Sequence, residues 1–278
     1  MEHIRLSAPS DIPVLRELWA LAFGDSGPYV DNFFDCYYRP ERMFVLEVEG
    51  VVRAMTAWFD TPFVLTSDTQ LPAAYLYAVA THPDFRSRGL SARLLRWADE
   101  QFRIWGYTCV TTVPAQPSLH NFFAANGFQE CFTHQELNRP AQCAPALPPA
   151  ITTLSPEEYG DLRESLLSHI PHIRFPVDAL TYQQGCCRVS GGGLYRCDTQ
   201  FGPVAVCAEG MEDGRLLLKE LLCPNHAPED LPTRLGFLFP NDAGLCRTPG
   251  SGVLFGMVKY LSTPPFRPKS AYLGLAFD

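Results

Sequence analysis

An arginine- and glycine-rich turn between an apolar strand and a helix is the part of this sequence best suited to chemistry. Residues 72–91 read Pro-Ala-Ala-Tyr-Leu-Tyr-Ala-Val-Ala-Thr-His-Pro-Asp-Phe-Arg-Ser-Arg-Gly-Leu-Ser. Backbone N–H groups at a helix N-terminus lack partners, and the helix dipole favours an anion there. Gly89 lets the main chain approach a phosphate closely, while Arg86 and Arg88 add positive charge and paired donors. The segment therefore predicts a pyrophosphate-binding loop.

The surroundings of the turn decide this interpretation, because the letters Arg-x-x-Gly-x-small are common. Residues 188–193, Arg-Val-Ser-Gly-Gly-Gly, fit the same pattern. They lie between two strand-like runs with no helix after them, so they predict a hairpin turn. The turn at Gly89, by contrast, is followed by apolar residues at helical spacing, namely Leu90, Leu94, Ala98 and Trp105. Charged residues occupy the other face of this predicted helix. We predict a strand, a phosphate loop and a helix that ends at Gly106; a strand, turn and helix that bind no ligand are the alternative.

The elements that must position this loop follow from hydrophobic periodicity along the first half of the chain. Their order is β-α-α-β-β-β-α-β-α-β, which predicts an α/β fold of the α+β type with a mixed central sheet. Strands are expected at 3–7, 43–49, 51–65, 73–81, 107–113 and 128–137, and helices at 11–23, 28–38, 90–105 and 118–126.

A proline-rich stretch divides the chain. Residues 139–150 contain four prolines and predict a linker between a first domain, 1–138, and a second domain, 151–278. The second half predicts strands at 186–197, 203–209, 214–222 and 253–261, a helix at 225–238 and a strand-like end at 272–277. The elements Leu-Ser and Leu-Arg-Glu near residue 5 recur near residue 153. This echo indicates a duplicated fold, although two ordinary capped helix starts explain it equally well.

Composition restricts the class of protein. The chain of 278 residues is 46% hydrophobic and 19% charged, with a net charge of −8, which is typical of a globular protein and disfavours nucleic-acid binding. No apolar run approaches the ~20 residues that span a bilayer, and the start does not resemble a signal peptide, so we expect a cytoplasmic protein without a membrane partner. The ten cysteines lie mostly in apolar runs without a Cys-x-x-Cys pair, so we expect free thiols and no metal site.

Together these residues resemble the GCN5-related N-acetyltransferase (GNAT) superfamily. The resemblance rests on residues 79–91, which look like the family's strand and pyrophosphate loop, on residues 121–128, which look like its helix ending in Gly-Phe, and on the element order. The two-part layout is similar to that of bacterial Eis-like proteins. This resemblance implies a GNAT domain followed by a second, degenerate GNAT-like domain that shapes the acceptor pocket.

The resemblance also implies acetyl-CoA as co-substrate, with no metal. Main-chain groups of Val79, Ala80 and Thr81 would meet the pantetheine arm, as an added strand does. The pyrophosphate would be bound by Arg86, Ser87, Arg88, Gly89, Leu90 and Ser91. The remaining cofactor contacts would come from Gln116, Ser118, Leu119 and Phe123.

Two positions depart from the family's usual chemistry. Phe123 stands where many members have the tyrosine that protonates the leaving thiolate, and Tyr75 stands where some members have a glutamate base. Losing the proton of an amine at pH 7 costs about 4 kcal/mol, so some acceptor is needed. Tyr75 and Tyr77, two residues apart on one strand face, are the first candidates. Asp278 is a candidate because Eis-like proteins are thought to use their terminal carboxylate as base.

Other polar residues have both a functional and a structural interpretation. His120 and Asp60 are further candidates for moving protons, but a surface position and a strand end explain them as well. Lys219 and Glu220 interrupt an apolar strand, where a salt bridge at the core edge is favoured over contact with substrate. Tyr75 and Tyr77 also fit an aromatic core.

Three functions remain compatible with the sequence. The first is direct transfer of an acetyl group to a primary amine of an unidentified small molecule or protein. The second is a non-catalytic module that binds acyl-CoA, which the replaced acid and base favour. The third is an amide-forming transferase fed by aminoacyl-tRNA, which the negative charge and the complete phosphate loop disfavour. The oligomeric state is left open.

Overall fold

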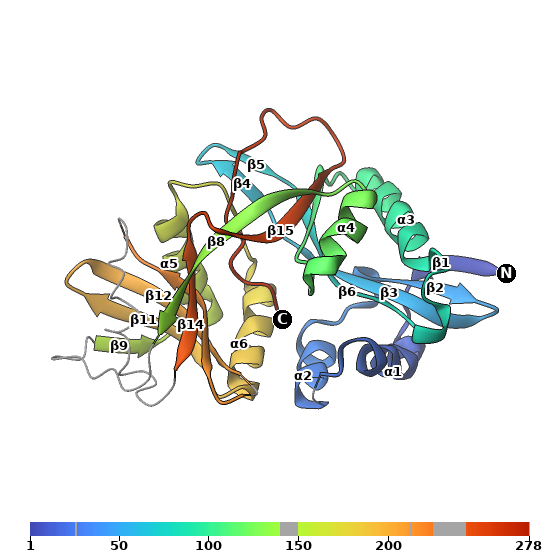
Figure 1. The fold of residues 1–278 in the computed structure, drawn as a ribbon, viewed down its shortest axis with the longest axis horizontal. Coiled ribbons are helices and arrows are strands. Elements are labelled where there is room, and N and C mark those ends of the chain that lie inside the picture. The colour runs from blue at the N-terminus through green and yellow to red at the C-terminus, as the bar shows by residue number, and fades with distance from the viewer. Residues whose placement is uncertain (26, 140–149, 212, 225–242, 278) are drawn as a thin grey trace. The chain divides into compact units, whose positions relative to one another are not determined.

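The computed structural model describes residues 1–278 except 26, 140–149, 212, 225–242 and 278. It divides into two compact units (Figure 1). Unit 1 comprises Met1–Phe63, Gln70–Glu130 and Gly256–Arg267, and unit 2 comprises Val64–Thr69, Cys131–Phe255 and Pro268–Asp278. The expected α/β class is confirmed. The expected linker lies mostly outside the described residues, so the boundary at 139–150 stays a prediction.

Unit 1 is a mixed sheet with helices on both faces. Its strands lie in the order β1-β2-β3-β6-β7-β15, in which β6 and β7 run parallel and the other neighbours antiparallel. The strands are β1 (Glu2–Leu6), β2 (Met43–Val48), β3 (Val51–Asp60), β6 (Ala73–Thr81), β7 (Cys109–Thr112) and β15 (Val253–Tyr260). The helices are α1 (Ile12–Phe23), α2 (Gly27–Asn32), α3 (Leu90–Ile104) and α4 (Pro117–Ala125), with short turns η1 (Pro9–Asp11), η2 (Phe33–Tyr37), η3 (Pro40–Arg42) and η4 (Pro83–Phe85).

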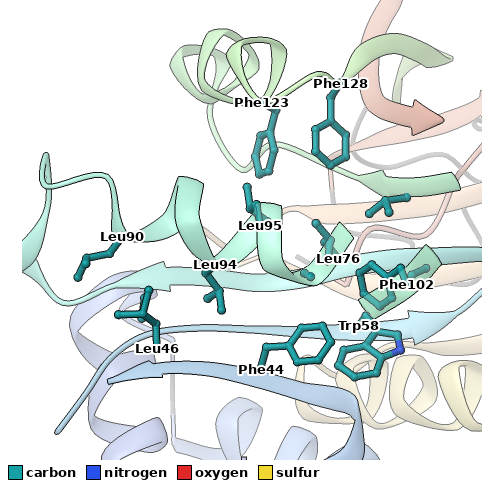
Figure 2. Close-up of a cluster of buried hydrophobic side chains, with 14 of the residues drawn as sticks. Phe44, Leu46, Trp58, Leu76, Leu90, Leu94, Leu95, Phe102, Phe123 and Phe128 are labelled. Carbon is teal, nitrogen blue, oxygen red and sulfur yellow. The ribbon is translucent and has the colours of Figure 1, made fainter. Parts of the chain in front are cut away.

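Helices α3 and α4 cover one face of this sheet (Figure 2). The predicted helical period is confirmed, because Leu90, Leu94 and Ala98 are all buried there. Phe44 of β2 stacks on Trp58 of β3 with ring centroids 4.4 Å apart. Burying each large side chain of this kind contributes roughly 1.5–3 kcal/mol, so the core fixes the start of α3 against the sheet.

Helix α1 and turn η2 contribute aromatic side chains to the opposite face. Trp19 lies 4.8 Å from Phe33 and 5.6 Å from Tyr77 between ring centroids. Phe59 contacts both Tyr75 and Tyr77, at 6.0 and 5.6 Å. The prediction that the two tyrosines share one strand face is therefore confirmed.

Unit 2 repeats the strand pattern of unit 1. Its strands lie in the order β9-β11-β12-β13-β14-β8, and again the fourth and fifth run parallel while the other neighbours are antiparallel. The strands are β8 (Gln129–Arg139), β9 (Ala150–Thr153), β11 (Gly193–Thr199), β12 (Gly202–Gly210), β13 (Leu216–Leu222) and β14 (Gly244–Pro249). The helices are α5 (Pro156–Leu167) and α6 (Val177–Val189); β4 (Phe63–Thr66), β5 (Thr69–Leu71) and β10 (His172–Ile173) form a small sheet.

Each unit takes its last strand from the other half of the sequence. Strand β8 follows α4 along the chain, yet it pairs with β14 in unit 2. Strand β15 follows β14 along the chain, yet it pairs with β7 in unit 1. The shared strand order indicates two copies of one fold, as the sequence echo suggested.

Three predictions for the second half need correction. The predicted strand at 186–197 is wrong in its first part, because Cys186 and Cys187 lie in α6 and the strand begins at Gly193. The Arg188–Gly193 segment is accordingly a helix end and not a hairpin; the N–H of Gly192 donates to the carbonyl of Cys187 at 2.6 Å. The predicted strand-like end at 272–277 is also wrong, because only Tyr272 forms an isolated bridge, with His172, and residues 273–277 belong to no strand. The predicted helix at 225–238 lies outside the described residues.

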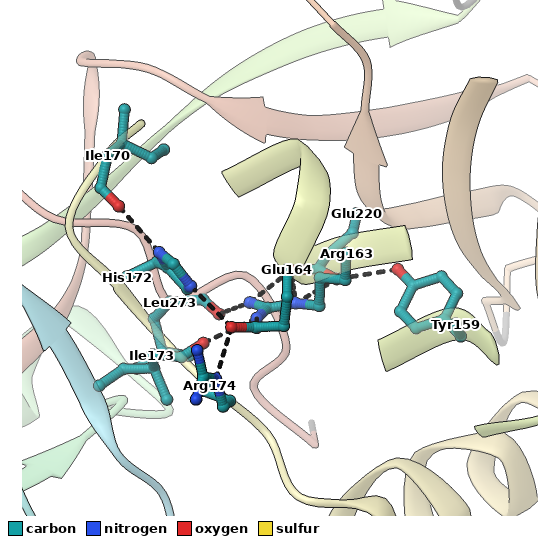
Figure 3. Close-up of polar contacts among 9 residues, drawn as sticks. All are labelled: Tyr159, Arg163, Glu164, Ile170, His172, Ile173, Arg174, Glu220 and Leu273. Carbon is teal, nitrogen blue, oxygen red and sulfur yellow. Dashed lines mark hydrogen bonds and ion pairs between the residues drawn. The ribbon is translucent and has the colours of Figure 1, made fainter. Parts of the chain in front are cut away.

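The charged pair in β13 forms ion pairs, as the favoured interpretation predicted, but these lie in the buried interior and not at the core edge. Lys219 Nζ lies 3.2 Å from Glu209 Oε1, and Glu220 accepts hydrogen bonds from Arg163 Nε at 3.0 Å and the Tyr159 hydroxyl at 2.8 Å (Figure 3). Both residues are fully buried, because β13 lies in the middle of its sheet.

Next to this pair, the pKa of Glu164 in α5 is well below its usual value. Burial alone would raise its pKa, but hydrogen bonds from His172 and Arg174 and the charge of Arg163 outweigh burial and lower the pKa to about 2 (Figure 3). Glu164 is therefore ionised at neutral pH and is a permanent part of the network.

Candidate functional site

The candidate site begins where two parallel strands of unit 1 separate. The described ladder between β6 and β7 ends at the pair Leu76 and Thr112. Two residues further on, Ala78 has a φ of 51°, and the register between β3 and β6 shifts there by one residue. A bulge of this kind bends a strand and increases its twist. The edge of β6 beyond Leu76 is thus available for an added extended chain, which is where Val79, Ala80 and Thr81 lie.

The predicted phosphate loop follows this strand directly. Turn η4 leads into residues 86–89, all exposed, and Gly89 caps α3 in the left-handed conformation with φ 74°. Thr81 and Ser91 share a hydrogen bond of 2.5 Å between their hydroxyls, which ties the strand end to the first turn of α3. Leu90 is buried in the core. The helix N-terminus is therefore fixed in place while its first N–H groups face outward.

Arginines of the loop are held by neutral groups. Arg86 Nε donates to the carbonyl of Thr81 at 3.3 Å, and Arg88 Nη2 donates to the carbonyl of Asp84 at 2.9 Å. The Arg88 guanidinium also lies over the Phe85 ring, at 4.7 Å from its centroid. Because these contacts involve carbonyls and a ring, the positive charge remains available to an anionic ligand.

Residues expected to meet the rest of the cofactor lie around α4. Gln116 precedes this helix as its N-cap, and Ser118 and Leu119 are exposed in its first turn. Phe123 is only 4% exposed and lies 5.4 Å from Phe128 between ring centroids, inside the core cluster (Figure 2). Phe123 is therefore part of the core, and the predicted cofactor contacts of all four residues stay predictions.

The two tyrosine candidates differ in their environment. Tyr75 is 1% exposed and lies in the part of β6 that is still paired with β7. Tyr77 is half-buried and lies one residue beyond the last described pair of that ladder. Only Tyr77 thus combines partial exposure with a position at the strand separation.

The other proton-transfer candidates have structural partners. Nδ1 of His120 lies 2.7 Å from Glu130 Oε1. Asp60 pairs with Arg42 at 2.8 Å and accepts a hydrogen bond from Tyr107, whose pKa is raised by burial and by that carboxylate. These contacts favour the structural interpretation of both residues. Asp278 lies outside the described residues, so its role stays a prediction.

Sequence reasoning missed two features of this site. Ala78 forms the bulge that separates the strands, but nothing in an alanine marks a bulge. The Arg53 guanidinium lies over the Phe85 ring at 4.5 Å and so borders the loop from β3. Only the pairing of β3 with β6 brings Arg53 there, so no local signal could have identified it.

Among the described residues, no group of three or more His, Cys, Asp or Glu side chains is placed to hold a metal ion. Within the same residues, no helix is both long and apolar enough to cross a membrane.

Comparison with known proteins identifies the unit that holds this site. Residues 3–125 match the model of the acetyltransferase (GNAT) domain. This part of the chain belongs to the GNAT acetyltransferases. The family that the loop and element order suggested is confirmed for these residues, which accordingly form an acyltransferase domain. No curated protein sequence matches the chain.

Solved structures extend the likeness to both units. The GCN5-related N-acetyltransferase of Kribbella flavida is similar with a TM-score of 0.68 and 14% identity over 94% of this chain and 71% of that one. Eis1 of Mycobacterium abscessus is similar with a TM-score of 0.65 and 12% identity over 94% and 74%. At such identities the likeness establishes the fold. The fold of this chain is therefore similar to that of Eis1 over both units, as expected from the two-part layout of the sequence.

Proposed function

We propose that this GNAT protein moves the acetyl group of acetyl-CoA directly to a primary amine of an acceptor. The observation that carries the proposal is the separation of β6 from β7 at Leu76, immediately before an arginine-rich loop that caps α3. A pantetheine arm would pair with the free edge of β6. The pyrophosphate would accept hydrogen bonds from the N–H groups of residues 87–91.

Catalysis at this site would depend mainly on how the two reactants are oriented. Acetyl-CoA supplies an activated thioester carbonyl; the amine nitrogen forms a bond to its carbon as the carbon–sulfur bond breaks and the amine loses a proton. Holding the two reactants in line contributes up to ~7–11 kcal/mol. Main-chain N–H groups near Val79 and Ala80 would polarise the carbonyl oxygen. Phe123 has no proton to give, so the thiolate would leave as an anion or be protonated by water.

Tyr77 is proposed to move the proton that the amine loses. Tyr77→Phe removes the hydroxyl but keeps the ring that packs on Trp19 and Phe33. We expect kcat to fall by about 10²-fold, the lower end of general acid–base effects, with little change in the KM for acetyl-CoA. Steady-state kinetics across a pH range would measure both parameters.

Tyr75→Phe is the matched control, because it removes the same atom from the same face of the same strand. Since Tyr75 is buried within the paired part of β6, we expect a kcat close to that of the wild type. Equal losses in the two variants would mean that the hydroxyls stabilise the strand and do not transfer protons.

Thiol release tests the proposed reaction itself. The protein is mixed with acetyl-CoA and a panel of aminoglycosides, polyamines, amino acids and lysine peptides, and free thiol is followed with time. Steady release that depends on one class of amine, with the acetylated amine detected by mass spectrometry, supports the proposal. Binding of CoA without turnover on any amine of the panel would contradict direct transfer to an amine.

A further inference from the structure

Unit 1 contains an open hollow of about 420 Å³ that is separate from the candidate site. Asp60 lines this hollow at the end of β3, where it pairs with Ala74 near the start of β6. Val79 lies five residues further along β6, which is roughly 16 Å away at about 3.3 Å per residue. A ligand in the hollow is therefore too far from the proposed thioester to accept its acetyl group.

Two indole rings form part of the lining of the hollow. Trp58 is only 2% exposed and stacks on Phe44 within the core (Figure 2). Trp105 follows α3, is 43% exposed and lies 5.6 Å from Trp58 between ring centroids. The faces of indole rings are electron-rich and attract cations more strongly than those of other aromatic side chains. Trp105 therefore offers accessible ring surface that suits a positive charge.

Negative charge exceeds positive charge in the lining. Among the described residues that line the hollow, Glu41 and Asp60 carry carboxylates and Arg42 carries the single guanidinium. Arg42 Nη2 lies 2.8 Å from Asp60 Oδ2, and its Nη1 donates to the Tyr37 hydroxyl at 3.3 Å. Because the charge of Arg42 is directed at Asp60, the exposed Glu41 gives the hollow an excess of negative charge, which favours a cation.

The Asp60 carboxylate already has hydrogen-bond donors from the protein. One of its oxygens faces Arg42, and the other accepts a hydrogen bond from the Tyr107 hydroxyl. Burial and the nearby carboxylate raise the pKa of Tyr107, so this phenol is neutral at neutral pH. A ligand therefore needs to bring positive charge more than it needs to bring donors. An alkylated ammonium group, which has a charge but no N–H, meets this requirement.

The end of α3 adds to the negative potential of the hollow. Helix α3 begins at the proposed phosphate loop and ends beside Trp105, so its positive end lies at the loop and its negative end at the hollow. Arg103 is the basic residue of the last turn, but its Nε donates to the carbonyl of Leu261 and it does not line the hollow. The helix that suits an anion at one end thus suits a cation at the other.

From the rings, the carboxylates and the helix end we propose that this hollow binds a small organic cation with an alkylated nitrogen, such as a trimethylammonium group. The nitrogen would lie against the ring of Trp105 near the carboxylates of Glu41 and Asp60, and its methyl groups would cover apolar ring surface. Such a nitrogen has no proton to lose and cannot be acetylated. The inference therefore does not depend on the reaction proposed for the candidate site.

Calorimetric titration of the full chain with choline, without acetyl-CoA, tests this site. The neutral isostere of choline, in which carbon replaces the nitrogen, has the same shape and should bind at least about tenfold more weakly. Trp105→Leu keeps an apolar side chain but removes the ring face, so it should weaken choline binding about tenfold. Glu41→Gln keeps the shape of an exposed side chain but removes its charge, and should weaken binding about threefold.

Matched controls separate the hollow from its surroundings. Trp97→Leu removes an indole of the same helix that also contacts Phe44, at 4.9 Å between ring centroids, but does not line the hollow. Glu17→Gln removes the same charge from an exposed residue of α1. Both variants should bind choline like the wild type. Gly89→Glu, which alters only the proposed phosphate loop, should do so as well.

Several outcomes would overturn the inference. Absence of saturable choline binding to the wild type is one, and equal affinity for choline and its isostere is another. A loss in Trp97→Leu as large as that in Trp105→Leu would place the effect in core packing around Phe44 and not in the hollow. Glu41 lies exposed on the surface, so Glu41→Gln tests the site even where Trp105→Leu does not fold. Wild-type affinity for choline in Glu41→Gln or in a folded Trp105→Leu would also contradict the proposal.

Discussion

Replacing Gly89 by glutamate should weaken the binding of CoA at least 100-fold. The substitution places a carboxylate at the N-terminus of α3, where the proposed pyrophosphate would lie, and like charges at that distance repel. It also adds a side chain where the main chain must approach the ligand closely, with the new Cβ 3.2 Å from Arg93 Nη1. A 100-fold loss corresponds to about 2.7 kcal/mol of binding free energy. Calorimetric titration with CoA would measure it.

Gly24 offers a closely matched control for this substitution. Gly24 and Gly89 share the same backbone angles, φ 74° and ψ 14°, so glutamate meets the same backbone strain at both. Gly24 follows α1, and nothing lies within 4 Å of a Cβ built there. Gly24→Glu should therefore bind CoA normally. Arg86→Ala should give an intermediate loss of about tenfold, the value of one charge-assisted hydrogen bond. Equal affinity in the wild type and Gly89→Glu would disprove the phosphate site.

Local patterns in the sequence were sufficient to predict the strand, turn and helix that form the proposed phosphate loop. An apolar strand, the glycine turn and the helical period after Ser91 are all set by neighbours within one or two turns of chain, and each is found in the structure. The error at Cys186 and Cys187 has the opposite cause. Buried helix residues and buried strand residues are both apolar, so a short run of them does not reveal its period.

Features that depend on distant segments could not be predicted. The exchange of β8 and β15 between the units follows from pairings made across more than a hundred residues. The alternation of side chains in a strand places Tyr75 and Tyr77 on one face. Which of them is exposed depends on where β7 stops pairing with β6, and that is set by the bulge at Ala78.

Removing the charge of Arg163 should lower the free energy of unfolding more than any other single substitution proposed for this protein. The side chains of Arg163 and Glu220 are 1% and 0% exposed. Arg163→Met leaves the Glu220 carboxylate buried without its cation and also frees the carbonyls of Ile173 and Leu273. Breaking one partner of a buried pair costs about 3–5 kcal/mol in the free energy of unfolding. Urea denaturation followed by circular dichroism would measure the change.

Two further variants show whether the cost comes from the unpaired charge. In the double variant Arg163→Met with Glu220→Met, both charges are removed, so we expect part of the lost stability to return. Arg196→Met breaks an exposed pair, 2.8 Å from Asp198 with side chains 42% and 48% exposed, and should cost far less stability than Arg163→Met. If Arg163→Met costs no more than Arg196→Met, the buried pair does not hold unit 2 together. A double variant that is less stable than Arg163→Met would mean that the buried Glu220 carboxylate stabilises unit 2 even without its cation. Its hydrogen bond from the Tyr159 hydroxyl would then outweigh the cost of the unpaired charge.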